Sequence, residues 1–291
     1  MSVPPARAGV VAVAASQQVL GFSSVTGAWV AHAAAGLSHN DKVVAQGDVA
    51  IVAVKASQQV LGFSAVTGAW TSHSAAGLTN LDQAAAGGSV GVVSVAASQQ
   101  VLAFRASTGV WAPHAAAGVT SADKVVSDGN VAIVAVKASQ QVLGFSAVTG
   151  AWTIHAAAGI SNTDQAAAGN SVGAVSVAAS QQVLAFRASN GVWLSHGAPG
   201  VTSADKVVSA GDVAIVAVKA SQQVLGFSAF TGAWTIHGAP GVSDTDRVAA
   251  GEDMGLVGVS ASQQVLAYVA ATGVWIQHAA AGLTTADILA V

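Results

Sequence analysis

Short runs of β-branched and aromatic residues alternate with turns of glycine and small polar residues along the whole chain. Between Asp41 and Gly77 these turns separate four apolar runs, each of a length typical of a β-strand. The runs predict strands over residues 42–45, 49–55, 60–64 and 69–73. Because the connections are short, we expect the four strands to pair in antiparallel order in one sheet.

The second of these runs, Val-Ala-Ile-Val-Ala-Val at 49–54, is apolar at both odd and even positions. A strand with one face in water alternates between apolar and polar residues, whereas a strand covered on both faces does not. The sheet is therefore predicted to be covered on both sides. A helical repeat is excluded because the 3.6-residue periodicity and the Leu/Glu/Lys-rich surface of such repeats are missing.

The same unit recurs at a constant step of 41 residues through the chain. The string Ser-Gln-Gln-Val-Leu begins at Ser16, Ser57, Ser98, Ser139, Ser180, Ser221 and Ser262. The step also relates every tryptophan of the chain, which are Trp29, Trp70, Trp111, Trp152, Trp193, Trp234 and Trp275. Seven units occupy 287 of the 291 residues, so we assign residues 1–291 to a single domain. Four-stranded sheets that are covered on both faces and recur at this period predict an all-β, seven-bladed β-propeller.

The two ends of the chain are offset within the repeat. Residues 9–15 align with a second strand, and residues 287–291 align with a first strand. We therefore expect the C-terminal strand to pair with the N-terminal three strands, which closes the ring and removes an exposed sheet edge. The apolar run near the N-terminus recurs at 91–97 and 173–179, so it is assigned to the fold rather than to a secretory signal peptide, and the localisation is left open.

Composition narrows the functional classes. Only 8% of the residues are charged and the mean hydropathy is +0.59, values that indicate a folded chain with a large core. The net charge of -3 offers no basic surface for nucleic acid or for an anionic membrane. With no cysteine, disulfides, thiolate metal sites and cysteine nucleophiles are excluded. We expect no cofactor and no metal.

The stretches at 42–49 and 60–70 resemble the blade of the pyrroloquinoline-quinone-type propeller repeat, and the resemblance extends over all seven units. It implies that the Thr-Gly turn and the following tryptophan dock adjacent blades. Two features differ from the family: Trp70 follows Gly68 after two residues rather than four, and the acidic residue usual after the third strand is Ser64 or, in alternate blades, an arginine. The quinone and its calcium ion do not carry over, because no acidic cluster interrupts the repeat.

One face of the predicted disc gathers a repeated set of polar residues, because the loops after the second and fourth strands emerge on the same side. In two blades this set comprises Ser57, Gln58, Gln59, His73, Asp82, Ser98, Gln99, Gln100, His114 and Asp123. These side chains either satisfy the backbone of turns and neighbouring blades or form a ring of groups for sugar hydroxyls or a peptide backbone. A histidine and an aspartate from each blade are too few for a metal site unless blades cooperate. The tryptophans either pack between blades or offer platforms for a sugar ring.

An enzyme needs an asymmetric arrangement of acids and bases. Here Ser, His and Asp recur in every unit, and the chain has one Glu and one Tyr, so we expect no catalytic residue and no enzymatic activity. The leading hypothesis is a monomeric interaction scaffold with seven near-equivalent blade sites for a protein or glycan. The alternatives are a multivalent lectin and a degenerate quinone-type enzyme. Near-identical alternate blades indicate a recently multiplied or deliberately built two-blade unit, so the invariance of a position is not evidence of function.

Overall fold

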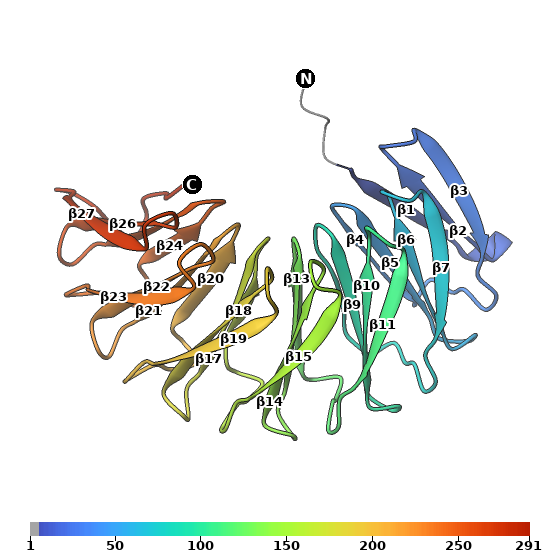
Figure 1. Ribbon diagram of the computed structural model, residues 1–291, viewed down its shortest axis with the longest axis horizontal. Helices are drawn as coiled ribbons and strands as arrows, with labels where there is room; N and C mark the ends of the chain where they lie inside the picture. The colour runs from blue at the N-terminus through green and yellow to red at the C-terminus, as the bar shows by residue number, and fades with distance from the viewer. Residues whose placement is uncertain (1–5) are drawn as a thin grey trace.

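A computed structural model describes residues 6–291 and shows seven antiparallel sheets that follow one another along the chain as blades 1 to 7 (Figure 1). Blade 1 has three strands, β1 (Ala8–Val13), β2 (Gln18–Ser23) and β3 (Ala28–Ala33), with a single 3-10 turn at Ala14–Ser16. Each of blades 2 to 7 has four strands. The fold is therefore a β-propeller with seven blades, as the repeat predicts.

The six complete blades have the same strand order, first to fourth, from one edge of the sheet to the other. Blade 2 contains β4 (Lys42–Gln46), β5 (Val49–Val54), β6 (Gln59–Ser64) and β7 (Ala69–Ser74), and blade 3 contains β8 (Ala84–Ala86), β9 (Val90–Val95), β10 (Gln100–Arg105) and β11 (Val110–Ala115). Blade 4 contains β12 (Lys124–Asp128), β13 (Val131–Val136), β14 (Gln141–Ser146) and β15 (Ala151–Ala156), and blade 5 contains β16 (Ala166–Ala168), β17 (Val172–Val177), β18 (Gln182–Arg187) and β19 (Val192–Gly197). Blade 6 contains β20 (Lys206–Ala210), β21 (Val213–Val218), β22 (Gln223–Ser228) and β23 (Ala233–Gly238), and blade 7 contains β24 (Arg247–Ala250), β25 (Met254–Val259), β26 (Gln264–Val269) and β27 (Val274–Ala279).

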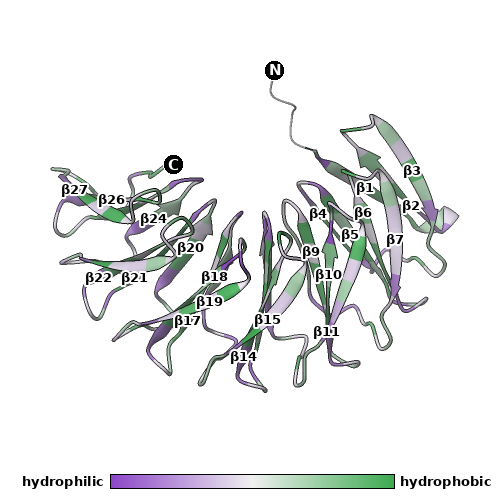
Figure 2. Ribbon diagram, viewed as in Figure 1, coloured by the Kyte–Doolittle hydropathy of each residue, from purple (hydrophilic) through white to green (hydrophobic). Residues whose placement is uncertain are grey.

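The blades are stacked side by side, with the first strands on the concave side of the molecule and the fourth strands outermost (Figure 1). Every residue of β5 is buried, which confirms that this apolar strand is covered on both faces. Hydrophobic residues lie mainly along the strands and hydrophilic ones mainly at strand ends and in loops (Figure 2). In residues 6–291 no helix has the length and apolar character needed to cross a membrane.

The hydrophobic core is a series of layers between neighbouring blades. In one layer, Val49, Ile51 and Val60 of blade 2 pack against Leu102 and Phe104 of blade 3, all of them buried. We call the face of a blade that meets the following blade its leading face, and the opposite face its trailing face. Because each layer is shared by two blades, the stability of a blade depends on its neighbours.

The expected closure of the ring is wrong in this structure. Blade 1 has only its three N-terminal strands, and residues 288–291 form no strand with β1. The C-terminal segment instead lies against its own blade: a methyl group on Gly258 would be 3.5 Å from Leu289, and one on Gly251 would be 3.1 Å from Val291. The stacked blades thus form an arc that is open between blade 7 and blade 1 (Figure 1).

Candidate functional site

The middle glutamine of each Ser-Gln-Gln turn has a left-handed backbone, with φ between 52° and 55° in all seven copies. In blade 2 the Gln58 side chain donates to the carbonyl oxygens of Lys55, at 2.5 Å, and Leu78, at 3.1 Å. Its Oε1 accepts from the backbone N–H groups of Gly77 and Leu78. Gln99 makes the corresponding bonds in blade 3. The amide that we considered for a ligand is thus bonded to the loop after the fourth strand.

The aspartate of the same face is a structural acceptor. Asp82 is 3% exposed, and its Oδ2 accepts from the backbone N–H of Thr79 at 2.7 Å, while Oδ1 accepts from that of Ala96 at 2.9 Å. Asp123 repeats this arrangement with the N–H groups of Thr120, at 2.7 Å, and Lys137, at 3.2 Å. Buried backbone N–H groups require an acceptor, so this carboxylate holds the loop to the next turn.

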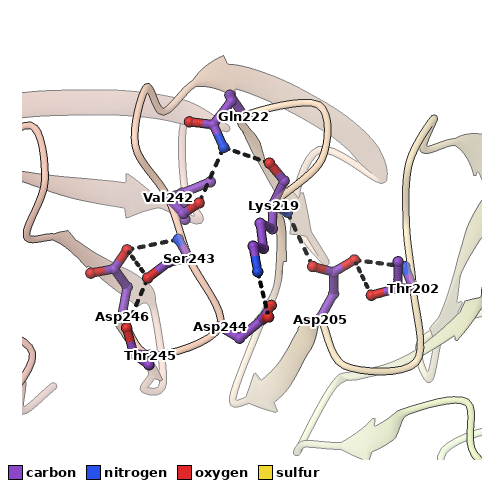
Figure 3. A network of polar contacts seen from close by, with 9 residues as sticks. All are labelled: Thr202, Asp205, Lys219, Gln222, Val242, Ser243, Asp244, Thr245 and Asp246. Carbon is purple, nitrogen blue, oxygen red and sulfur yellow. Dashed lines mark hydrogen bonds and ion pairs between the residues drawn. The ribbon is translucent and has the colours of Figure 1, made fainter.

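Figure 3 shows the same network across blades 5 to 7. Asp205 joins Thr202 to Lys219 of the next turn, and the Gln222 amide reaches the carbonyl oxygens of Lys219 and Val242. Lys219 and Asp244 form the one ion pair found within residues 6–291, with 3.0 Å between Nζ and Oδ2. Because both side chains are exposed, this pair is worth at most about 1 kcal/mol.

The remaining polar residues of this face are half-buried. Gln59 and Gln100 begin the third strands β6 and β10 and lie opposite Ser74 and Ala115. The hydroxyl oxygens of Ser57 and Ser98 are buried without a hydrogen-bond partner among the described residues. The structure therefore brings the predicted serine, glutamine and aspartate residues together at the loops of one face.

The tryptophans lie between blades. Trp70 donates from its indole N–H to the carbonyl oxygen of Val30 in the preceding blade at 2.9 Å, and its ring centre is 5.1 Å from that of Phe63. Five further tryptophans donate in the same way, namely Trp111, Trp152, Trp193, Trp234 and Trp275. Within residues 6–291 no blade precedes that of Trp29, which is 57% exposed. These contacts support the first of the two interpretations of the tryptophans, which is that they pack between blades.

The histidines stack on these indoles. His73 of blade 2 has its ring centre 6.2 Å from that of Trp111 in blade 3, and His114 is 6.0 Å from Trp152. Among the described contacts the histidines make no hydrogen bond to the aspartates nine residues further on. The carboxylate oxygens of Asp82 and Asp123 accept from backbone N–H groups instead.

A hollow that sequence reasoning missed lies on the concave side. It has a volume of 460 Å³ and is lined by the first strands β4, β8 and β12 of three consecutive blades. Val44, Ala85 and Val125 provide much of its apolar lining, while Gln46 and Ser127 add polar groups. The sequence did contain a signal for this hollow. In an antiparallel sheet of four consecutive strands the first run must lie at an edge, and the structure shows that the first strands are indeed paired on one side only.

One end of this concave surface is acidic and bounded by the turns between the first and second strands. Carboxylates lie in these turns at Asp48, Asp212, Glu252 and Asp253, and Asp128 ends the strand β12 beside the corresponding turn. The turns are joined from blade to blade by backbone bonds, such as Asp48 N–H to the Gly88 carbonyl at 2.6 Å. Burial raises the pKa of Asp48, which borders a second hollow of 320 Å³ beside Arg7.

No family model matches the chain, and no curated protein matches it. Among solved structures, streptogramin B lyase is 9% identical, with 89% of this chain and 92% of that chain covered and a TM-score of 0.38. The computationally designed Ika8 protein is 14% identical, with coverages of 96% and 85% and a TM-score of 0.37. BamB from Moraxella catarrhalis is 16% identical, with coverages of 94% and 81% and a TM-score of 0.33. These three are β-propeller proteins, but the assignment of the fold given above depends on the sheet topology of this chain.

Proposed function

We propose that the protein is a non-catalytic interaction scaffold that binds an extended polypeptide segment along its concave surface. The observation that carries the proposal is the 460 Å³ hollow built by β4, β8 and β12. Each of these strands is hydrogen-bonded to a neighbour on one side only, so its other edge has free backbone donors and acceptors. An extended segment can pair with such an edge while its apolar side chains enter the hollow.

The charge of the surface favours a ligand with basic residues at one end. Five acidic residues lie at this end of the concave surface. Two of them, Asp48 and Asp128, belong to blades whose first strands line the hollow, and Arg7 is the basic residue in the second hollow. Complementary charge raises the rate and the specificity of association. Because first strands recur from blade 2 to blade 7, near-equivalent sites follow one another along the arc.

The polar face is a weaker candidate for the ligand, because its glutamine and aspartate side chains are engaged by the backbone. The indoles are likewise engaged between blades, which disfavours a lectin with tryptophan platforms.

As part of this proposal we assign the blades to the pyrroloquinoline-quinone-type repeat without its cofactor. The docking of Trp70 between blades 1 and 2 supports that assignment.

The proposal is tested by selecting binders from a phage-displayed library of random peptides. Ala85→Trp fills the hollow from β8, and Ala115→Trp places the same side chain at an exposed position of the outer strand β11. Selected peptides should be enriched in Lys or Arg, and they should bind Ala115→Trp normally and Ala85→Trp at least about 10-fold more weakly.

Circular dichroism would verify that both variants are folded. The proposal fails if no peptide is enriched, or if the enriched peptides bind Ala85→Trp as tightly as the parent. Saturation of several equivalent sites by a simple sugar on a glycan array would instead establish the lectin.

A further inference from the structure

The trailing face of blade 1 is uncovered. Val11 is 45% exposed and Trp29 is 57% exposed, although the residues that correspond to Val11 in blades 2 and 4, Val52 and Val134, are fully buried. The ring of Phe22 is also half-exposed, whereas its counterpart Phe63 is fully buried. The positions of Val11 and Phe22, which are buried in each of the other six blades, are thus open to solvent at this end of the arc.

The leading face of blade 7 is uncovered in the same way. Met254 is 39% exposed and Ile276 is 57% exposed, whereas Val213, which corresponds to Met254 in blade 6, is fully buried. The residue that corresponds to Ile276 in blade 5 is Leu194, which packs against Phe227 of the following blade. The two ends of the arc therefore present the two halves of the contact that holds the blades together.

The unused polar partners match as well. Each tryptophan from blade 2 to blade 7 donates to a carbonyl 40 residues earlier, and the repeat places the acceptor for Trp29 at Ile276. Each histidine from blade 1 to blade 6 stacks on the tryptophan of the next blade, and within the described residues His278 has no such partner. Joining blade 7 to blade 1 would complete both columns.

The missing strand of blade 1 is also present at the other end. In blade 2, Val43 of the first strand lies opposite Val52 of the second. Counting by the repeat, Leu289 has the place of Val43 and Val11 that of Val52. Leu289 and Val291 already lie against Gly258 and Gly251 of blade 7, where a following first strand would lie.

The chain's own blade 1 does not occupy this place. The indole bond and the histidine stacking recur between all successive blades, so the rotation from one blade to the next is similar and sets the curvature of the arc. That curvature leaves blades 1 and 7 apart (Figure 1). A single chain would have to distort its repeated interfaces to meet itself, whereas a second chain can dock without such distortion.

We propose that a second copy of this chain docks head to tail, with its blade 1 on the leading face of blade 7. Residues 288–291 of the first chain then provide the missing first strand of blade 1 in the second chain, with Leu289 opposite Val11. This inference goes beyond the proposed function and does not depend on it. It replaces the expectation of a monomer with a head-to-tail assembly. The rotation per blade determines whether this assembly closes into a ring or continues as a filament.

Sedimentation velocity across a wide range of protein concentration tests the proposal. The parent chain should sediment as multiples of 28.2 kDa, with more assembly at higher concentration. Val11→Glu puts a carboxylate into the junction and should weaken association about 100-fold or more, because an unpaired buried charge is costly. Val192→Glu is the control, since Val192 is also 45% exposed but lies on an outer strand, and it should assemble like the parent.

A mixture of variants tests the direction of docking. Ile276→Glu should be monomeric alone, as should Val11→Glu, but an equal mixture of the two should form dimers. In that mixture the intact blade 7 of Val11→Glu meets the intact blade 1 of Ile276→Glu, and no further junction can form. Ring closure within one chain predicts a parent that stays at 28.2 kDa at every concentration, and that result would overturn the proposal. Assembly that survives Val11→Glu, or a mixture that stays monomeric, would also overturn it.

Discussion

The tryptophan column allows one residue type to be tested in two environments of the same chain. Trp111 lies between blades 2 and 3, is 9% exposed, and donates to the Thr71 carbonyl at 3.3 Å. Trp29 occupies the same place in blade 1 but is 57% exposed and has no preceding blade. If the column serves to pack blades, truncation must cost more at Trp111 than at Trp29.

The magnitudes follow from burial. Trp111→Ala removes a nearly buried indole and leaves a cavity against Phe104 and His73, for which a loss of about 3–5 kcal/mol is expected. Trp29→Ala removes a side chain that is less than half buried, so in the monomer its loss should be about 1–2 kcal/mol. The expected difference between the two variants is about 2–3 kcal/mol.

Guanidinium unfolding followed by circular dichroism measures this difference. Both variants are compared with the parent at a protein concentration at which sedimentation shows monomers, because docking of a second chain would also bury Trp29. Equal losses at the two positions, or a folded Trp111→Ala with unchanged stability, would refute the interpretation of the column as interblade packing.

Three further changes test other parts of the structure. Asp164→Ala leaves the N–H groups of Ser161 and Ala178 without their acceptor and should cost about 2–4 kcal/mol in urea unfolding, whereas Asp244→Ala should cost at most about 1 kcal/mol; equal costs would contradict the structural role of the buried aspartates. Burial raises the pKa of Asp48 above its ordinary value of 3.8, so the folded state disfavours the charged carboxylate and becomes less stable as pH rises through this range. Asp48→Asn removes the charge and should raise the melting temperature at pH 7 but not at pH 3. Burial lowers the pKa of His155, so its contribution to stability is present above pH 6.5 and is lost as pH falls through the folded pKa; His155→Gln should flatten the acid side of the melting curve, and an unchanged slope would contradict this.

The sequence was sufficient to predict the blades because each strand has its own local signal. The predicted first strand, 42–45, is one residue shorter than the observed Lys42–Gln46, and the predicted second strand, 49–55, one residue longer than the observed Val49–Val54. The β-branched second strand recurs in every blade, and the Thr-Gly turn recurs in six of the seven units, with Asn190-Gly191 in the fifth, so local propensity and the global fold agree. The same regularity predicts that the glutamine and aspartate residues share one face, and in the structure the Gln58 amide bonds the carbonyl of Leu78 in the loop that also contains Asp82.

Closure could not be predicted, because it depends on the rotation between blades. The repeat shows that residues 287–291 have the pattern of a first strand, but small differences in rotation accumulate over the six interfaces between successive blades. The role of the polar face was also undecided at the level of sequence. Gln58 has an amide that can bind a ligand. Only its φ of 55° and its hydrogen bonds to Lys55 and Leu78 show that this amide is used within the protein.

The central claim is that the repeated polar side chains hold the loops of one face instead of awaiting a ligand. Amide hydrogen exchange resolved by NMR tests it most directly. The N–H groups of Gly77 and Leu78, which donate to Gln58, and of Ala96, which donates to Asp82, should exchange far more slowly than the neighbouring exposed N–H of Ala76. Exchange of all four amides at the same fast rate would contradict the claim and return the polar face to the list of binding surfaces.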